Sequence, residues 1–597
     1  FIRIHKPYKN FVPTREDVVY MSEFAGGTGA LSNSHSIFLS TVVGQGNEEQ
    51  CRFWLPRIMN FEITGSYAQT ELGHGSNVRG LQTVAEYDKN TEEFVLNTPT
   101  LQSIKWWPGC LGKVATHCVL YAQLVIDGKE YGVNVFLLQI RDENHLPLPG
   151  IRLGDIGVKM GDNANDTGFM WLDNVRIPRE YMLMKYRRVT KEGKYEDVIK
   201  ADPKVHYTTM MTTRATMVNT ASARLAMGAT IAIRYSCVRQ QGFVDSSTKT
   251  FRASENKIID YKIQQYRLFK QLAYAYALKF TGRWMTEQLG ALEGKSIGII
   301  KNSELLKELA STSAGLKSLS TIIATNGIED CRKCCGGNGY LLSSGIAAIA
   351  NDYLWQVTAE GDYIILAMLT GKHLLKSVGK VFGGLKLQGI MEYLNVISEP
   401  EFDLAKHRPT PAHLKTEYMN LNYLFSLFRY RALERNINTA KEFNQHISNG
   451  MNFEEAFNVC SNEILKATHS HCYYIIMHNF MNKIKEVSNP AIQKVLTRLC
   501  ILFSCCNLLD ENWGDVIRED QYVFIREVAY TVMNEIRPDA VALVDAFGFP
   551  DNVLRSDIGK YDGNVYEALF DSAQKSILNR SDPFQGYEQY LKPHLNK

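Results

Sequence analysis

A β-rich stretch enclosed between two long helical stretches is the feature that most constrains how this chain can fold. Residues 14–64 carry apolar side chains at helical spacing, and Thr14, followed by acidic residues, is typical of a helix N-terminus. From residue 65 to about 203, short runs of β-branched and aromatic residues alternate with Gly, Asn and Asp, which indicates strands joined by turns. Strong helix formers then return. We therefore expect a mainly α protein with a central β domain.

The length of the chain predicts several domains, because 597 residues exceed what a single hydrophobic core supports. The second helical stretch is interrupted by a segment with three prolines, which is typical of a linker. The predicted divisions are a partial N-terminal helical domain (1–64), a β domain (65–203), a first C-terminal helical domain (204–399), the linker (400–411) and a second C-terminal helical domain (412–597).

Composition excludes some function classes. Hydrophobic residues make up 45% and charged residues 22%, as in globular proteins, and the net charge of +3 with intermixed signs argues against a nucleic-acid partner. No apolar run is long enough to predict a transmembrane segment. The twelve cysteines are irregularly spaced, which favours a reducing compartment over a disulfide framework. The chain opens at Phe1, so we expect residues to precede it.

Two segments of the β-rich stretch are candidates for binding a ligand. Residues 67–77 combine hydroxyls, an amide and glycines, which let a backbone approach a ligand, and Thr70 can donate to a ring heteroatom. A polar β-turn is the alternative interpretation of this segment. Residues 105–113 place two tryptophans beside a Pro-Gly turn that ends at Gly109, which suits either a wall for a flat aromatic cofactor or a domain core.

Two further segments lie in the second helical stretch. Residues 331–340 contain one C-x-x-C and a glycine-rich run; no second ligand pair lies near, so no metal site is expected, and the glycines form either a phosphate cradle or a flexible turn. Residues 358–362 place Glu360 after small residues and before Gly361. This carboxylate is either a general base on a loop before a helix or an acidic residue favoured by the helix dipole.

These four segments occur together, in this order, in acyl-CoA oxidases, a branch of the acyl-CoA dehydrogenase superfamily, which the chain resembles over nearly its whole length. The resemblance implies a truncated N-terminal helical domain, a β-barrel-like middle domain, a C-terminal helical bundle and a second C-terminal helical domain. It is weakest beyond the linker. The most specific matches are Tyr67–Gly75, Ser103–Gly109, Gly154–Gly157 and Arg176–Tyr186.

The resemblance implies an FAD-dependent enzyme of fatty-acid β-oxidation. Its substrate is a fatty acyl-CoA, its product a trans-2-enoyl-CoA, and molecular oxygen is reduced to hydrogen peroxide. Glu360 matches the catalytic base, which removes the α-proton, and burial beside the flavin is expected to raise the pKa of this residue. The implied enzyme is a homodimer. The residues that the resemblance places at the cofactor are Thr70 and Gly109 at the flavin ring, Arg239 at the FAD phosphate across the dimer interface, and Gly336, Gly337 and Gly339 in a turn near the partner's cofactor.

Five positions depart from the family pattern. Where the family has Asn, Gln, Ala, Arg and His, this chain has Tyr363, Leu369, Gly371, Lys372 and Asn338. An apolar leucine cannot make the hydrogen bonds of an amide, and lysine lacks the bidentate fork of arginine. Two alternatives therefore stay open: an acyl-CoA dehydrogenase that uses an electron-transfer flavoprotein, and a degenerate oxidase-like binding or structural protein.

The last residues, 590–597, resemble the tail of the family, which ends in a peroxisomal tripeptide of the Ser-Lys-Leu type. One further leucine after Lys597 would complete a variant of that signal. We therefore expect a slightly longer native chain in the peroxisome, with the mitochondrial matrix as the alternative. Neither the preferred acyl length nor the CoA-binding residues follow from the sequence.

Overall fold

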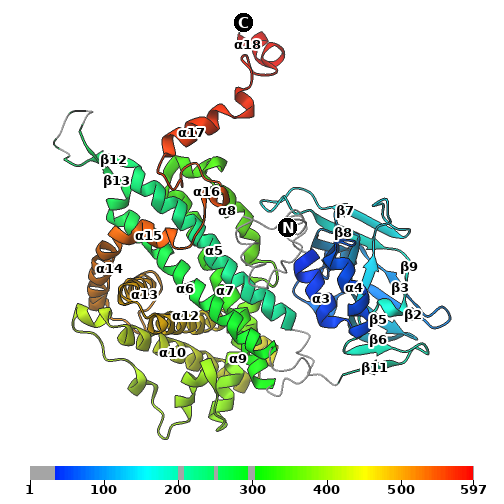
Figure 1. The fold of residues 1–597 in the computed structure, drawn as a ribbon. Coiled ribbons are helices and arrows are strands. Elements are labelled where there is room, and N and C mark those ends of the chain that lie inside the picture. Colours follow the sequence, from blue (N-terminus) through cyan, green and yellow to red (C-terminus); the bar gives the residue numbers. More distant parts are fainter. Residues whose placement is uncertain are drawn as a thin grey trace. The chain divides into compact units, whose positions relative to one another are not determined.

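The computed structural model describes residues 34–199, 208–245, 247, 250, 253–293 and 303–595 (Figure 1). Residues 14–33 of the expected helical stretch, the domain boundary at 203–204 and the terminal Asn596-Lys597 lie outside these ranges. The chain forms two compact units. The first comprises Phe1–Thr216, Met285–Ala314 and Thr358–Leu366, and the second comprises Met217–Trp284, Gly315–Val357 and Ala367–Lys597.

The first unit is built on two β-sheets. The larger sheet has the order β1-β5-β2-β3-β9, with β6 paired to β5 off this path, and its strands are β1 (Gly65–Ala68), β2 (Val84–Asp88), β3 (Glu93–Asn97), β5 (His117–Ile126), β6 (Lys129–Gln139) and β9 (Val175–Pro178). The smaller sheet has the order β4-β8-β7, from β4 (Lys105–Gly109), β8 (Thr167–Leu172) and β7 (Ile151–Asp155). A hairpin of β10 (Arg187–Val189) and β11 (Tyr195–Asp197) follows.

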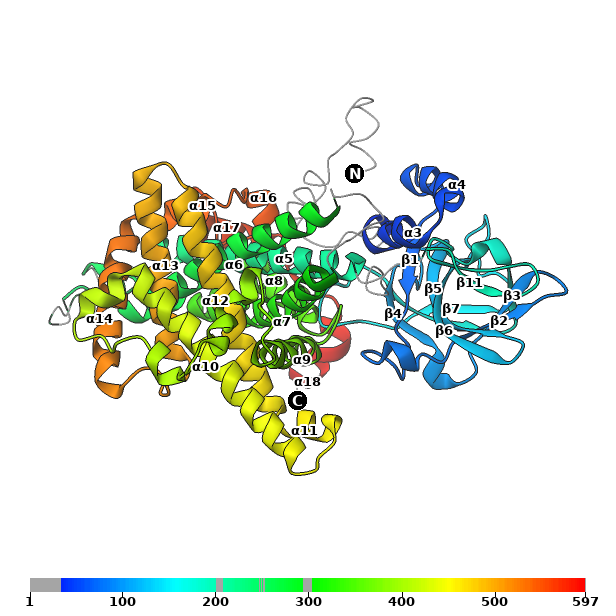
Figure 2. The ribbon, with the colours of Figure 1, turned by 90° about the horizontal axis from the view of Figure 1, so that it is seen from below.

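Alternating side chains along the strands explain how this unit is layered. One face of the larger sheet contributes Phe94, Leu120 and Phe136 to a buried core shared with the smaller sheet. The other face carries Val119 and Leu137, which pack against two short helices, α3 (Leu39–Gln45) and α4 (Glu48–Met59). Figure 2 shows these two helices beside β1. A strand pair with both faces covered in this way has its register strongly specified.

The α4 helix is fixed at its start by a capping box. The Asn47 side chain accepts from the Gln50 amide, and the Gln50 side chain accepts from the Asn47 amide. The Gln50 side-chain nitrogen also donates to the carbonyls of Glu180 and Met182, at 2.7 and 2.6 Å. One side chain therefore both caps the helix and anchors it to the chain that follows β9.

The second unit is helical. Its longest elements are α5 (Thr208–Val238), α6 (Lys262–Glu293), α7 (Ser303–Cys334), α9 (Tyr363–Phe382), α10 (Leu421–Ser448), α12 (Ser461–Glu486), α13 (Pro490–Asp510) and α14 (Tyr522–Ile536), of which the first four begin or end in the first unit. Aromatic contacts join α6, α10 and α12 to α13, with ring centroids 4.9 Å apart for Tyr274 and Phe503 and 6.0 Å for Phe428 and Phe503. Such aromatic pairs stabilise the packing of helices beyond the contribution of the apolar area that they bury.

Helix α13 is, among the described residues, the one helix that is long and apolar enough to cross a membrane. Asn489 caps its first turn, and Pro490 stands at the position where a missing N–H costs nothing. Of its most apolar window 61% is buried inside the protein, which is typical of a helix in a protein core.

The prediction of a mainly α protein with a central β region is confirmed. The predicted domain limits stay a prediction. Each compact unit combines separate segments of the chain, so the units do not test limits between consecutive domains. One element that the sequence did not indicate is a hairpin after α5, of β12 (Gln240–Phe243) and β13 (Glu255–Lys257). The predicted linker, 400–411, contains a 3-10 turn at Leu404–His407, and Arg408 donates to the carbonyls of residues 515 and 516.

Candidate active site

Thr70 and Gly109, the residues expected at a flavin ring, lie on adjacent segments of the first unit. The Thr70 carbonyl, two residues after β1, accepts a hydrogen bond of 2.9 Å from the Trp106 amide in β4. At the end of β4, the Gly109 carbonyl accepts one of 2.7 Å from the Ser66 hydroxyl in β1. Both residues are half-buried. The β1 and β4 strands thus bring the two predicted ring contacts together.

The tandem tryptophans have different surroundings. The register between β4 and β8 shifts between Trp106 and Gly109, and Trp107 has a φ of +85°, so the strand bulges there. Trp106 stacks on Phe169 with centroids 5.9 Å apart, whereas Trp107 is 58% exposed. Because of the bulge, Trp106 packs against the neighbouring strand, whereas Trp107 lies on the surface of the described chain.

A buried ion pair holds the 69–75 loop against β4. Lys105 Nζ lies 3.1 Å from Glu71 Oε1 and donates to the Gln69 carbonyl at 3.1 Å, and neither charged side chain is exposed. The Glu71 carboxylate also accepts from the Thr83 amide at 2.8 Å and its hydroxyl at 2.6 Å. Burial lowers the pKa of Lys105 to about 8, against the opposing attraction of Glu71. The pKa of Glu71 is lowered because Lys105 and these hydrogen bonds outweigh its desolvation.

Glu360 stands in a strained turn. Its φ is +54°, in the left-handed region that a glutamate rarely adopts, and Gly361 follows with φ +104°. A side chain on Gly361 would approach Leu366 to 2.8 Å, so only glycine suits this position. The Asp362 carboxylate then caps α9 by accepting from the Ile364 amide at 2.9 Å. Strain of this kind persists where the surrounding structure enforces it, and it is concentrated at functional sites.

The Glu360 carboxylate acts electrostatically on two tyrosines of the larger sheet. Tyr67 in β1 and Tyr121 in β5 have ring centroids 5.1 Å apart, and the Tyr67 hydroxyl donates to Gln69 Oε1 at 2.8 Å. Burial raises the pKa of Tyr121 to about 12, and the charge of Glu360 adds to this shift. The pKa of Tyr67 is raised by burial, by Tyr121 and by Glu360. Glu360 therefore lies close to the strand that leads into Thr70.

Arg239 and the glycine-rich turn are brought together in the second unit. The turn, a 3-10 segment at Gly336–Tyr340, follows α7, and Arg239 follows the last residue of α5. Asn338 donates to the Tyr235 hydroxyl at 3.0 Å, and Tyr235 lies one helical turn before Arg239. Among the described residues, the Arg239 side chain has neither a hydrogen bond nor an ion pair. Its guanidinium donors are thus available to an anion.

The three glycines of the turn are not equivalent. Side chains at Gly336 or Gly337 would meet no described atom within 4 Å, and both residues are exposed. A side chain on Gly339 would lie 2.2 Å from the Arg332 carbonyl, so this glycine is required by packing within the chain itself. Open space for a ligand therefore adjoins Gly336 and Gly337, whereas Gly339 supports the shape of the turn.

The structure gives physical reasons for three of the five departures from the family pattern. A methyl group on Gly371 would lie 2.1 Å from Ile464 Cγ2, so alanine does not fit here. Lys372 places its ammonium 4.5 Å from the Phe453 ring centroid and 3.7 Å from Glu454, where it packs on the surface of the second unit. Asn338, as described above, holds the glycine-rich turn to α5.

The other two departures are at the start and middle of α9. Tyr363 is the first residue of this helix and is half-buried. Leu369 is 46% exposed, and nothing in the structure explains a leucine there.

Sequence reasoning did not identify Tyr121 or the role of the Glu71–Lys105 pair. A lysine immediately before two tryptophans in a strand was the available signal for the ion pair, because a charged residue in such a run needs a buried partner. Tyr121 carried no local signal: it is one of many aromatic residues in strands, and only the β1–β5 pairing brings it to Tyr67.

Comparison with known proteins agrees with this fold. Residues 207–375 match the family model for the acyl-CoA oxidase C-alpha1 domain, and residues 420–596 match that for acyl-CoA oxidase. The peroxisomal acyl-coenzyme A oxidase 1 of Rattus norvegicus is 39% identical over 589 residues, which cover 97% of this chain and 86% of the rat protein. The protein of the same name from Arabidopsis thaliana is 39% identical over 580 residues, which cover 94% of this chain and 83% of that protein.

Solved structures show the same fold. Arabidopsis thaliana acyl-CoA oxidase 1 superposes with a TM-score of 0.92 at 37% identity, covering 100% of this chain and 89% of that one. Acyl-CoA oxidase-2 of Caenorhabditis elegans, solved with FAD, ascaroside-CoA and ATP, superposes with a TM-score of 0.92 at 34% identity, covering 100% of this chain and 88% of that one.

The fold has the acyl-CoA dehydrogenase-like architecture, and the similar proteins identify the class as an oxidoreductase. Within that class, the chain belongs to the acyl-CoA oxidase family. The named location of the similar proteins agrees with the peroxisome predicted from the tail, rather than the mitochondrial matrix.

Proposed function

We propose that this chain oxidises fatty acyl-CoA to trans-2-enoyl-CoA with Glu360 as the catalytic base, FAD as cofactor and molecular oxygen as the electron acceptor, which becomes hydrogen peroxide. The observation that carries the proposal is the strained turn at Glu360 and Gly361, whose carboxylate acts on the two tyrosines beside the segment that ends in Thr70. A carboxylate carried by a strained backbone turn next to a preorganised loop suits a positioned general base.

The residues present fit FAD. Half-buried Thr70 and Gly109 on adjacent segments suit a flat ring. Arg239, whose guanidinium has no hydrogen bond or ion pair among the described residues, and the exposed glycines 336 and 337 suit a phosphate. When bound, FAD supplies the acceptor for the two electrons removed from the substrate. Gly339 is proposed to act indirectly, by keeping the shape of the turn.

The protein's own contribution is proton removal and positioning. The α-proton of a saturated thioester is weakly acidic, so the carboxylate that accepts it must be held in place while the thioester oxygen is stabilised. We assign proton removal to the Glu360 carboxylate and stabilisation of the thioester oxygen in part to the Glu360 amide. The positive φ of this residue sets the direction of its amide relative to its Cα–Cβ bond.

A homodimer is proposed because Arg239 and the glycine-rich turn match family positions that lie near the partner's cofactor. The guanidinium available on Arg239 and the open space at Gly336 support such a contact.

The proposal is tested with the purified flavoprotein and a series of saturated acyl-CoA thioesters. Peroxide formed in a one-to-one ratio with enoyl-CoA, without any added carrier, is the expected result. Turnover only with an artificial dye or an electron-transfer flavoprotein would mean a dehydrogenase. A protein that neither carries flavin nor recovers its absorbance with added FAD would instead be the degenerate binding protein.

Replacing Arg239 by Gln should weaken FAD binding. Loss of charge-assisted hydrogen bonds to a phosphate costs about 1.5–3 kcal/mol, which is about a 10- to 100-fold rise in Kd. The measurement is fluorescence titration of the apoprotein with FAD. Arg152→Gln removes an exposed arginine of the β region and is the matched control, for which no change is expected. Equal Kd values for the two variants would remove Arg239 from the cofactor site.

Replacing Tyr121 by Phe should move the acid limb of the pH profile of kcat/KM to higher pH. The hydroxyl is a polar group close to Glu360, and its loss leaves the carboxylate in a more apolar setting, which favours the protonated form. The base must be ionised, so activity falls as pH decreases, and in the variant it should begin to fall at a higher pH. Tyr131→Phe, in the same domain, is the control. An acid limb at the same pH as in the wild type would mean that Tyr121 does not influence the ionisation of Glu360.

A further inference from the structure

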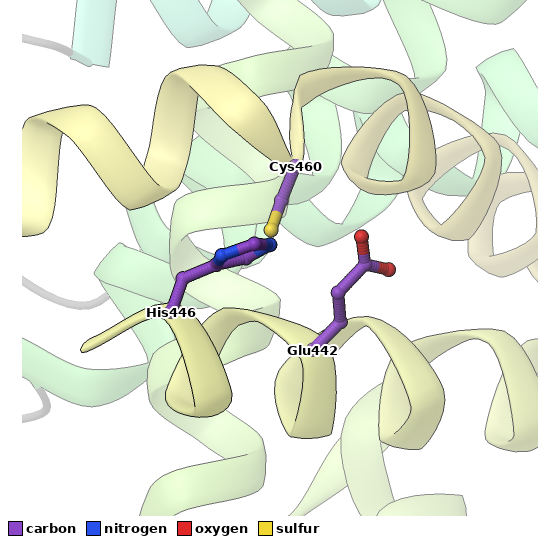
Figure 3. A group of neighbouring side chains, drawn as sticks. All are labelled: Glu442, His446 and Cys460. Carbon is purple, nitrogen blue, oxygen red and sulfur yellow. The ribbon is translucent and has the colours of Figure 1, made fainter. Parts of the chain in front are cut away.

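Three side chains of the second unit, remote in sequence from the proposed catalytic residues, converge at one end of α10. Glu442 and His446 lie four residues apart on this helix, so both project from the same face. Cys460 stands between α11 (Phe453–Val459) and α12. One carboxylate oxygen, one imidazole nitrogen and the thiol sulfur all lie within 4.8 Å of one another. Figure 3 shows the three side chains gathered at one place.

The backbone around these residues is firmly held. The chain leaves α10 through a turn in which Gly450 has φ +96° and the Met451 amide donates to the His446 carbonyl at 3.1 Å. A capping box between Asn452 and Glu455 then starts α11. The three groups are therefore positioned by folded elements, as a preformed metal site requires.

A small apolar cluster backs the site on one side. Cys460 is fully buried in a cluster with the buried side chains of Phe443 and Ile464, and Phe453 packs on Phe443 with ring centroids 5.2 Å apart. Glu442 is exposed and His446 is half-buried, so the other side is open to solvent. The arrangement gives an entry path for an ion from the side opposite the cluster.

The charges near Cys460 favour a cation. A carboxylate oxygen of Glu442 lies within 4.8 Å of the Cys460 thiol, and Glu463 stands in the first turn of α12, which Cys460 precedes. Glu463 is already engaged by Lys466 at 2.7 Å and Arg435 at 3.7 Å. In the part of the chain that the structure describes, neither a hydrogen bond nor an ion pair occupies the Glu442 carboxylate or the His446 ring. A carboxylate, an imidazole and a thiol thus face one another, and none of the described residues is hydrogen-bonded or ion-paired to the first two.

We propose that Glu442, His446 and Cys460 form a zinc site with three protein ligands and an open fourth position. One sulfur, one nitrogen and one oxygen donor match the borderline-soft character of Zn²⁺, whereas Mg²⁺ and Ca²⁺ prefer oxygen donors alone. A water molecule would complete the tetrahedron. Bound zinc would join the last turn of α10 to the junction of α11 and α12. The proposal does not depend on the catalytic function.

Cobalt(II) is the probe, because its visible d–d bands report tetrahedral coordination at wavelengths beyond the absorption of oxidised flavin. The holoenzyme is stripped of metal with a chelator, titrated with Co²⁺, and then with Zn²⁺ in competition. We expect one tetrahedral Co²⁺ per chain, displaced by one equivalent of Zn²⁺. Since losing a group that merely supports a metal ligand costs about 10- to 100-fold in affinity, Cys460→Ser should weaken binding at least about tenfold.

Matched controls separate this site from adventitious binding. His446→Gln should weaken binding as Cys460→Ser does, and it keeps the test valid if the buried serine prevents folding. Cys51→Ser removes a half-buried thiol elsewhere, and His413→Gln removes an exposed histidine. Both controls should bind Co²⁺ as the wild type does. Weak, octahedral cobalt spectra that are the same in all five proteins would overturn the proposal.

Discussion

The Glu360→Gln variant should bind FAD normally and lose about 10²- to 10⁴-fold in kcat, the usual contribution of a general base. Glutamine preserves the size and shape of the side chain but cannot accept a proton at neutral pH. The substitution should leave the strain of the turn in place, because φ +54° is a feature of the backbone and glutamine, like glutamate, has a Cβ atom. The measurement combines flavin absorbance with steady-state peroxide release and a single-turnover experiment that follows flavin reduction.

A neighbouring carboxylate provides the control for this result. Asp362→Asn also converts an acid into its amide two residues along the chain, and asparagine can still cap α9. We expect this variant to retain most of the activity. Comparable losses in both variants would mean that the turn as a whole, rather than the proton acceptor, limits the reaction. Near-normal turnover of Glu360→Gln would exclude Glu360 as the base.

The succession of helical, β and helical regions could be predicted because each has its own local signal. The strands at 94–96, 119–121 and 133–138 were predictable from β-branched and aromatic runs, and they lie within β3, β5 and β6. The β12–β13 hairpin was not predictable. Its strands are short and exposed, with almost no apolar alternation to mark them.

The site was predictable to the extent that its residues occur in short motifs. Thr70 and Gly109 each lie in a distinctive segment, but their adjacency depends on hydrogen bonds between β1, β4 and the loop after β1. Gly361 was the only sequence signal for the left-handed turn at Glu360. Gly371 shows the limit most clearly: its apparent departure from the family is explained by the approach of Ile464, a residue 93 positions later in the chain. Long-range packing of this kind leaves no local trace.

The buried pair of Glu71 and Lys105 leads to a second large effect. In Lys105→Met, the Glu71 carboxylate stays buried without an opposite charge, which costs about 3–5 kcal/mol. In a domain of this size, each kcal/mol of lost unfolding free energy lowers the melting temperature by about 2–4 °C. The apparent unfolding midpoint of the β region should therefore fall by about 10 °C. Because Lys105 also holds the Gln69 carbonyl, the loop that carries Thr70 should loosen and FAD should bind more weakly. Calorimetry and FAD titration measure the two effects.

The double variant Lys105→Met with Glu71→Gln tests whether the unpaired charge or the altered packing causes the loss of stability. The side-chain amide introduced by Glu71→Gln can still accept from Thr83 but carries no charge, so most of the lost stability should return. A double variant as unstable as Lys105→Met alone would mean that the unpaired charge is not the cause of the loss.

The pH dependence of stability gives a second check on the same pair. In the wild type the lowered pKa of Glu71 contributes stability above the unfolded-state pKa, and this is lost as the pH falls through the folded-state pKa. In Lys105→Met the carboxyl is expected to protonate more readily, so the stability difference from the wild type should shrink in acid. A difference that stays constant with pH would mean that Lys105 acts by packing alone, and that the loop bearing Thr70 is positioned without its charge.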